Sequence, residues 1–138
     1  MHYLQMAAEK LAKAYFWRSG KPPSKSHSGL RQFLKFLGHI GKRDRVRIAN
    51  LFSFNRFADF QNWIRIVQPI ACDLERLAPD LADDGPNPEY PWPHAQPQYA
   101  PAHHNFAVWV SLTSSGQGRN LIRVIHVAVD RFPEYADT

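Results

Sequence analysis

The chain has 138 residues, an apolar content of 44% and a formal net charge of +5, which together predict one globular domain with a hydrophobic core. No apolar run reaches the ~20 residues that a transmembrane helix requires, so we expect no membrane-spanning segment. The first residues lack the features of a secretory signal, and Cys72 is the only cysteine, which excludes an internal disulfide. A cytoplasmic location fits these observations best.

The charge is divided unevenly along the chain. Residues 1–70 contain 13 Lys and Arg against 3 Asp and Glu, whereas residues 71–138 contain 4 against 9. The first half is therefore suited to attract phosphate groups, and the second half to repel them or to cover a basic face. The alternative interpretation is a solvated surface combined with attraction between the two halves or between subunits.

The N-terminal region predicts two helices. Residues 3–18 have apolar side chains at helical spacing, and Gly20 with Pro22 and Pro23 ends this helix. A second helix follows, which either Ser26 or Ser28 caps and which Gly38 and Gly41 end. Its buried stripe consists of Leu30, Phe33, Leu34 and Leu37.

Two further helices are expected in the middle of the chain. Asp44 is a candidate cap for a short helix that reaches about Phe54. A longer apolar stripe at helical spacing runs from Phe57 to Leu77, and Pro69 lies inside it. Because proline cannot donate the helical hydrogen bond, we expect a kink or a break near Gln68.

The C-terminal region begins with residues 79–101, which hold seven of the eleven prolines and predict an extended connection. Aromatic residues within it favour docking on the helices rather than a free linker. Residues 104–112 are ambiguous and are interpreted as helical, and a final helix is expected from about Arg119 to Phe132. The whole pattern predicts an all-α, up-and-down bundle of four or five helices in one domain, residues 1–138, with a long proline-rich loop before the last helix.

One part of the sequence resembles a known family. The run Ala7-Ala8-Glu9-Lys10-Leu11-Ala12-Lys13-Ala14, followed by Gly20, Pro22-Pro23, Lys25-Ser26-His27 and Leu30, resembles the signature of HEPN domains. Later segments, Leu74-Glu75-Arg76-Leu77 and Glu89-Tyr90-Pro91, resemble the final part of such domains. The resemblance implies a helical bundle. HEPN domains usually have another helix before this signature. Either the bundle is one helix short, a partner subunit covers the missing surface, or the start of the chain is incomplete. Because an uncovered apolar face is costly, the difference favours a dimer, in the first place a homodimer.

Catalytic HEPN proteins have an arginine, often followed by a polar residue, and a histidine separated from the arginine by four to six intervening residues. Arg119, Asn120 and His126 match this pattern. On a helix, the first and last of these lie on one face, about 10 Å apart along the axis. The resemblance implies that Arg119 holds a phosphate, His126 acts as acid and base, and Asn120 orients them. The alternative is that His126 merely lies on the polar side of the last helix.

A second candidate surface combines basic residues with aromatic ones. A basic strip with interleaved aromatic residues comprises Lys42, Arg43, Arg45, Arg47, Phe52, Phe54 and Arg56, which is typical of a surface that contacts RNA phosphates. The predicted contacts are Lys42, Arg43, Arg47 and Arg56. An amphipathic helix with a basic solvent face is the alternative. Gly116 and Gly118, which precede the last helix, are a further but weaker anion-binding candidate.

Two function classes follow. The first is a HEPN-like RNA-targeting protein, in its catalytic form a metal-independent endoribonuclease of a toxin–antitoxin or defence system. The second is a non-catalytic module that dimerises, binds a cognate protein partner such as a nucleotidyltransferase-like protein, or binds a nucleotide. No cofactor is expected. No metal is expected either, because no cysteine or carboxylate cluster completes a ligand set with His94, His103 and His104.

Overall fold

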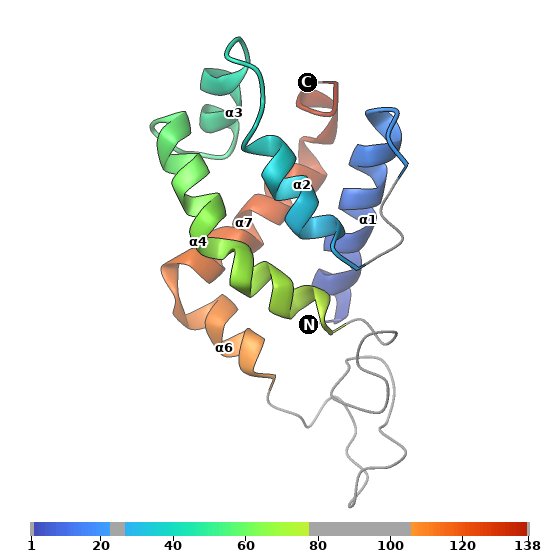
Figure 1. Ribbon diagram of the computed structural model, residues 1–138. Helices are drawn as coiled ribbons and strands as arrows, with labels where there is room; N and C mark the ends of the chain where they lie inside the picture. Colours follow the sequence, from blue (N-terminus) through green and yellow to red (C-terminus); the bar gives the residue numbers. More distant parts are fainter. Residues whose placement is uncertain (1, 23–26, 78–105, 138) are drawn as a thin grey trace, which may run out of the picture.

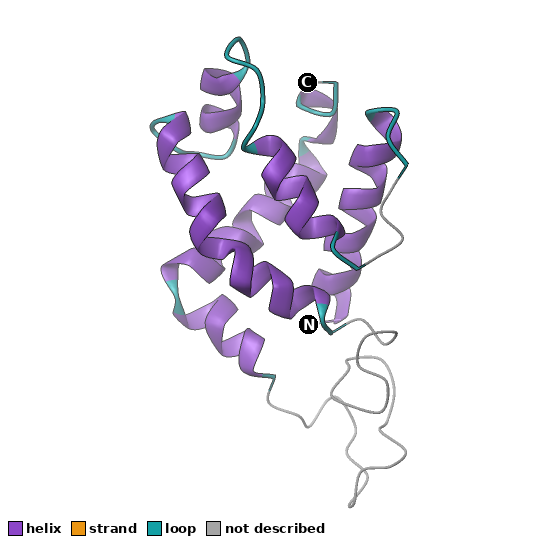
Figure 2. Ribbon diagram, in the orientation of Figure 1, coloured by secondary structure: helices purple, strands orange, loops and turns teal. Residues whose placement is uncertain are grey.

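The computed structural model describes residues 2–22, 27–77 and 106–137. These residues form six α-helices and one 3₁₀-helix, and no strand occurs among them (Figures 1 and 2). The helices are α1 (His2–Arg18), α2 (Gly29–Leu37), α3 (Arg45–Leu51), α4 (Phe57–Glu75), α6 (Ala107–Ser114), α7 (Gly116–Asp130) and the 3₁₀-helix η2 (Phe132–Glu134). The prediction of an all-α helical bundle is confirmed, although the described helices number six rather than four or five.

Helix α4 is the centre of the bundle, because α1, α2, α3, α6 and α7 all contact it (Figure 1). Its buried face includes Phe60, Ile64 and Val67, which recur at the spacing that one side of a helix requires. Pro69 does not break the helix, and α4 changes direction partway along its length in Figure 1. Of the two expected outcomes, the break is therefore wrong, and the bend is the one observed.

A cluster of aromatic side chains fills the core between α1, α2 and the C-terminal segment. Tyr135 is fully buried, and its ring lies 6.1 Å from those of Tyr15 and Phe33 and 5.9 Å from that of Phe52. Its hydroxyl donates a hydrogen bond to the Ala128 carbonyl at 2.6 Å. Burial raises the pKa of the Tyr135 phenol, so this group stays neutral and donates its proton to the carbonyl. The C-terminal segment is thus part of the core.

The N-termini of two helices differ from the expected caps. Ser28 precedes α2 without making a side-chain cap, and Ser26 lies outside the described residues. Glu75, from the end of α4, instead accepts the Arg31 N–H at 3.0 Å and the Arg31 Nε at 2.7 Å. A remote carboxylate therefore satisfies the first turn of α2 and ties the two helices together.

Asp44 likewise precedes α3 without a side-chain cap. Its carboxylate forms an ion pair with Arg47 at 3.0 Å instead. Helix α3 ends at Leu51 rather than near Phe54, because Ser53 adopts a left-handed backbone with φ of 59°, which a right-handed helix cannot continue.

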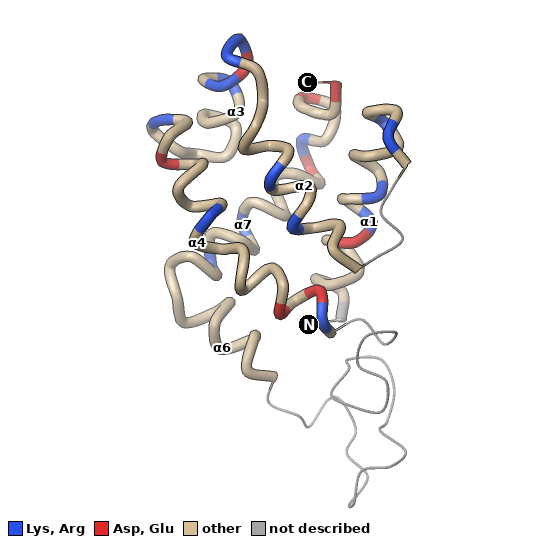
Figure 3. The backbone as a smooth tube through the Cα atoms, viewed as in Figure 1, with Lys and Arg blue, Asp and Glu red and all other residues tan. Residues whose placement is uncertain are grey.

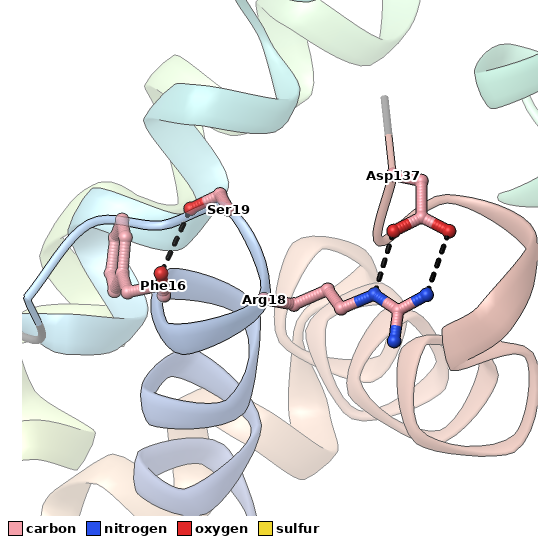
Figure 4. Close-up of polar contacts among 4 residues, drawn as sticks. All are labelled: Phe16, Arg18, Ser19 and Asp137. Atoms are coloured by element: carbon pink, nitrogen blue, oxygen red, sulfur yellow. Dashed lines mark hydrogen bonds and ion pairs between the residues drawn. The ribbon is translucent and has the colours of Figure 1, made fainter.

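The end of α1 and the C-terminal segment meet at the surface. Arg18, the last residue of α1, donates two hydrogen bonds to the Asp137 carboxylate, at 2.7 and 3.0 Å (Figure 4). The neighbouring arginine lowers the pKa of Asp137. Because both side chains are exposed, this pair fixes the position of the C-terminal segment more than it adds to stability.

None of the helices in the described part of the chain combines the length and apolarity needed to cross a bilayer. The expected proline-rich connection, with its aromatic residues, lies outside the described residues. The ambiguous region before the last helix is helical from Ala107 onward, as predicted.

Candidate functional site

The corner between α6 and α7 positions the predicted site. Ser115 makes the corner: its hydroxyl donates to the Ser111 carbonyl at 2.6 Å and accepts the Gly118 N–H at 2.9 Å. Gly118 is buried, and a Cβ added to it would lie only 2.1 Å from the Ser111 carbonyl oxygen. The proposed anion-binding role of Gly118 is therefore wrong, because its N–H is used within the corner and its lack of a side chain allows the two helices to touch.

Arg119 and Asn120 have local structural partners. The Arg119 Nη1 atom donates to the carbonyls of Thr113 and Ser114, at 3.1 and 3.2 Å, at the end of α6. These carbonyls have no partner within their own helix, so the guanidinium caps them. The Asn120 side-chain oxygen accepts a hydrogen bond from Arg123 at 3.3 Å rather than one from Arg119.

His126 lies on the exposed side of α7, at a groove with a volume of about 470 Å³. The groove is formed by α1, α6 and α7, and most of its lining side chains are apolar. The lining residues are Tyr3, Leu4, Ala7, Trp109, Ile122, Ile125, His126, Val129 and Asp130.

Arg119 and His126 lie on one continuous helix, α7, as the predicted helical spacing of the two residues requires. No hydrogen bond joins the two side chains among the described residues, and Arg119 does not line the groove that contains His126. Arg119 and His126 therefore lie on the same helix, but Arg119 contacts the end of α6 while His126 lies at the groove.

Arg123 on α7 contacts a segment that is far away in the sequence. Its Nη1 atom donates to the Phe52 carbonyl at 2.8 Å, and its guanidinium lies 5.7 Å from the centre of the Phe54 ring. The alternative interpretation of the last helix, in which polar residues such as His126 only decorate its polar side, would place Arg123 there too. The structure corrects this interpretation, because the side chain is half-buried and links α7 to the segment between α3 and α4.

The basic strip is partly neutralised. Arg47 pairs with Asp44 and also donates to the Glu134 carbonyl, and Arg56 donates to both carboxylate oxygens of Asp59, at 2.9 and 3.0 Å. The Arg56 guanidinium lowers the pKa of Asp59. Lys42 and Arg43 are exposed before α3, in the basic turn at the top of Figure 3. Two of the four predicted phosphate contacts are therefore already paired with acids.

No group of three or more metal-ligating side chains occurs among residues 2–22, 27–77 and 106–137. His94, His103 and His104 lie outside these ranges.

Comparisons with known proteins find no matching family model, no similar curated protein and no similar solved structure. The HEPN resemblance therefore depends on the quoted motifs alone and stays a prediction.

Proposed function

We propose that this chain is an RNA-targeting helical protein in which Arg119 and His126 cleave RNA without a metal ion, as in catalytic HEPN proteins. The observation that carries the proposal is the placement of His126, exposed at the mouth of a groove on the helix that also presents Arg119. A histidine in contact with solvent is accessible to a polynucleotide, whereas a buried one is not.

The contacts of Arg119 are compatible with phosphate binding. Both hydrogen bonds to α6 use Nη1, which leaves the Nη2 and Nε donors of the guanidinium available. Arginine donors of this kind bind phosphate oxygens in pairs. The imidazole of His126 would remove the proton of a ribose 2′-hydroxyl, whose oxygen then attacks the adjacent phosphorus and forms a 2′,3′-cyclic phosphate. The bond to the 5′-oxygen breaks, and the imidazolium returns the proton to that oxygen, so the second fragment leaves with a 5′-hydroxyl.

The test is incubation of the purified chain with RNA in the presence of EDTA. We expect cleavage by the wild type and at least a hundredfold loss in both Arg119→Ala and His126→Ala, with helical content retained. Arg76→Ala is the matched control, because Arg76 is an exposed arginine at the end of another helix, and its cleavage rate should equal that of the wild type. Unchanged cleavage in His126→Ala, or no cleavage by the wild type, would contradict the proposal.

A second candidate function has its own support. The groove beside His126 is surrounded by exposed apolar side chains: Tyr3 is 84% exposed, Trp109 46% and Val129 49%. Helix α6 has no charged residue, as the uniformly tan tube in Figure 3 shows. Such a surface favours a non-catalytic module that binds a second copy of the chain or a cognate protein partner.

Sedimentation equilibrium separates the two candidates. A second copy on this face predicts a dimer whose dissociation constant rises at least tenfold in Trp109→Ser. Trp17→Ser is the control, since Trp17 is 72% exposed and does not line the groove. A dimer without RNA cleavage supports the module, whereas a monomer at millimolar concentration contradicts a homodimer.

A further inference from the structure

A second groove lies between α2 and α4 and has a volume of about 460 Å³. It is distinct from the groove at His126, because the two share no residue. Its lining contains no acidic side chain. The lining residues are Lys35, Gly38, His39, Gln61, Ile64, Arg65 and Gln68.

Two cations line this groove from opposite helices. Lys35 lies in the last turn of α2 and Arg65 lies on α4, and both are exposed. Arg65 makes one described hydrogen bond, from Nη2 to Asn62 at 3.3 Å, and no ion pair among the described residues involves either cation. Unlike Arg47 and Arg56, these two residues keep an uncompensated positive charge, which favours an anion between the helices.

The groove also holds a hydrogen-bond donor with no described partner. The Gln68 side-chain nitrogen is buried without a hydrogen bond to any described residue. An unsatisfied buried amide destabilises a protein, so such a group calls for an explanation. An acceptor oxygen of a bound ligand would satisfy it after the Gln68 side chain turns from its buried position towards the groove.

His39 provides a further polar atom. Its Nδ1 lies 2.6 Å from the Lys35 carbonyl oxygen. Because a carbonyl only accepts hydrogen bonds, Nδ1 carries the proton, and Nε2 is left as an acceptor for a hydroxyl or amino group of a ligand rather than for its phosphate.

The carbonyls at the end of α2 would ordinarily repel an anion, because the C-terminus of a helix carries partial negative charge. Two of them are already occupied here. The Gly38 carbonyl accepts the Gln61 side-chain nitrogen at 2.7 Å, and the Lys35 carbonyl accepts His39. The repulsion is therefore reduced where the groove meets the helix end.

We propose that the α2–α4 groove binds a phosphomonoester of nucleotide size. The charge of the phosphate dianion matches Lys35 and Arg65, the two exposed cations that line the groove. The volume falls within the range of small-ligand sites, ~300–1,000 Å³, and leaves space for an organic group beside Ile64. This site does not depend on the cleavage proposed for α7.

Isothermal titration calorimetry of the whole chain at low salt tests the proposal, with adenosine 5′-monophosphate, adenosine and inorganic phosphate as probes. We expect the monophosphate to bind at least tenfold more tightly than adenosine. Lys35→Ala and Arg65→Ala should each weaken its binding at least fivefold. Lys10→Ala and Arg76→Ala are matched controls on exposed residues outside the groove, and they should change binding less than twofold.

Gln68→Leu separates a ligand role from a structural one. Because this variant removes a buried donor that has no described partner, its melting temperature should equal or exceed that of the wild type, while it binds the monophosphate at least threefold more weakly. A pair of RNA oligonucleotides, with and without a 5′-phosphate, shows whether the bound phosphate belongs to an RNA end or to a free nucleotide. Tighter binding of the phosphorylated one indicates an RNA end, and equal binding indicates a free nucleotide.

The proposal is overturned if adenosine binds as tightly as its monophosphate. It is also overturned if neither phosphate probe binds at millimolar concentration, or if the Lys35→Ala, Arg65→Ala double variant keeps the wild-type affinity for the monophosphate.

Discussion

The two grooves of the bundle have nearly equal volumes, about 470 and 460 Å³, but different linings. The groove of α1, α6 and α7 has mostly apolar walls with one histidine and one aspartate, whereas the groove of α2 and α4 has two cations, one histidine and two amide side chains. A surface of the first kind suits a protein partner, and one of the second kind suits an anion. The difference shows that net charge alone does not locate a phosphate site, since the arginines of the basic strip are largely paired with acids.

The two grooves also depend on different supports. The apolar groove depends on the close contact of α6 with α7 at Gly118. The cationic groove depends on the attachment of α2 to α4 through Glu75 and Gln61. Substitutions at these supports should therefore affect one groove more than the other.

The largest effect is expected from Gly118→Ala. The new Cβ would lie 2.1 Å from the Ser111 carbonyl and 2.5 Å from the Leu112 Cα, both in the backbone, so α6 must move. We expect a loss of about 3 kcal/mol in the free energy of unfolding, measured by urea denaturation, and loss of any self-association. Gly116→Ala is the control, because no atom lies within 4 Å of its added Cβ. Equal stability of the two variants would show that the corner is not closely packed.

A smaller effect is expected from Glu75→Ala. This change removes the acceptor of the Arg31 N–H and guanidinium, and it leaves the first turn of α2 without its carboxylate. The free energy of unfolding should fall by about 2 kcal/mol, and phosphate binding between α2 and α4 should weaken while the α6–α7 groove keeps its properties. Asp73→Ala, an exposed acid two residues earlier, should change stability by less than about 0.5 kcal/mol.

The smallest effect is a difference in pH dependence between the wild type and Glu75→Gln. Burial outweighs the Arg31 contacts and raises the pKa of Glu75, so the folded state binds this proton more tightly than the unfolded state does. The stability of the wild type relative to the variant should therefore increase as the pH falls from 7 through the raised pKa towards the unfolded value of about 4.3. Urea denaturation at a series of pH values measures this trend, and the opposite slope would show that the ion pair dominates.

The sequence predicts the helices well where apolar residues recur clearly at helical spacing. All four apolar residues of the predicted stripe of α2 are buried, from Leu30 to Leu37, because their spacing matches a single helical face. The contribution of Tyr135 was not predicted. It follows the last helix, and no periodic pattern indicates that a residue outside a helix enters the core.

The candidate site was only partly predictable for the same reason. The turn count correctly placed Arg119 and His126 on one helix, but it could not show that Arg119 caps α6, since a long side chain has many possible partners. Lys35 and Arg65 are thirty residues apart in the sequence, and only the packing of α2 on α4 brings them to one groove. Local patterns therefore favoured the continuous basic strip over the groove that the fold assembles.

The burial of Tyr135 has a consequence for how the protein forms during translation. The ring packs against Tyr15, Phe33 and Phe52, which are synthesised long before it. While residue 135 is still inside the ribosome, the faces of these three rings that pack on Tyr135 in the folded protein remain uncovered. The bundle can thus reach its final packing only after that tyrosine emerges, which leaves the nascent helices exposed to chaperones and proteases until then.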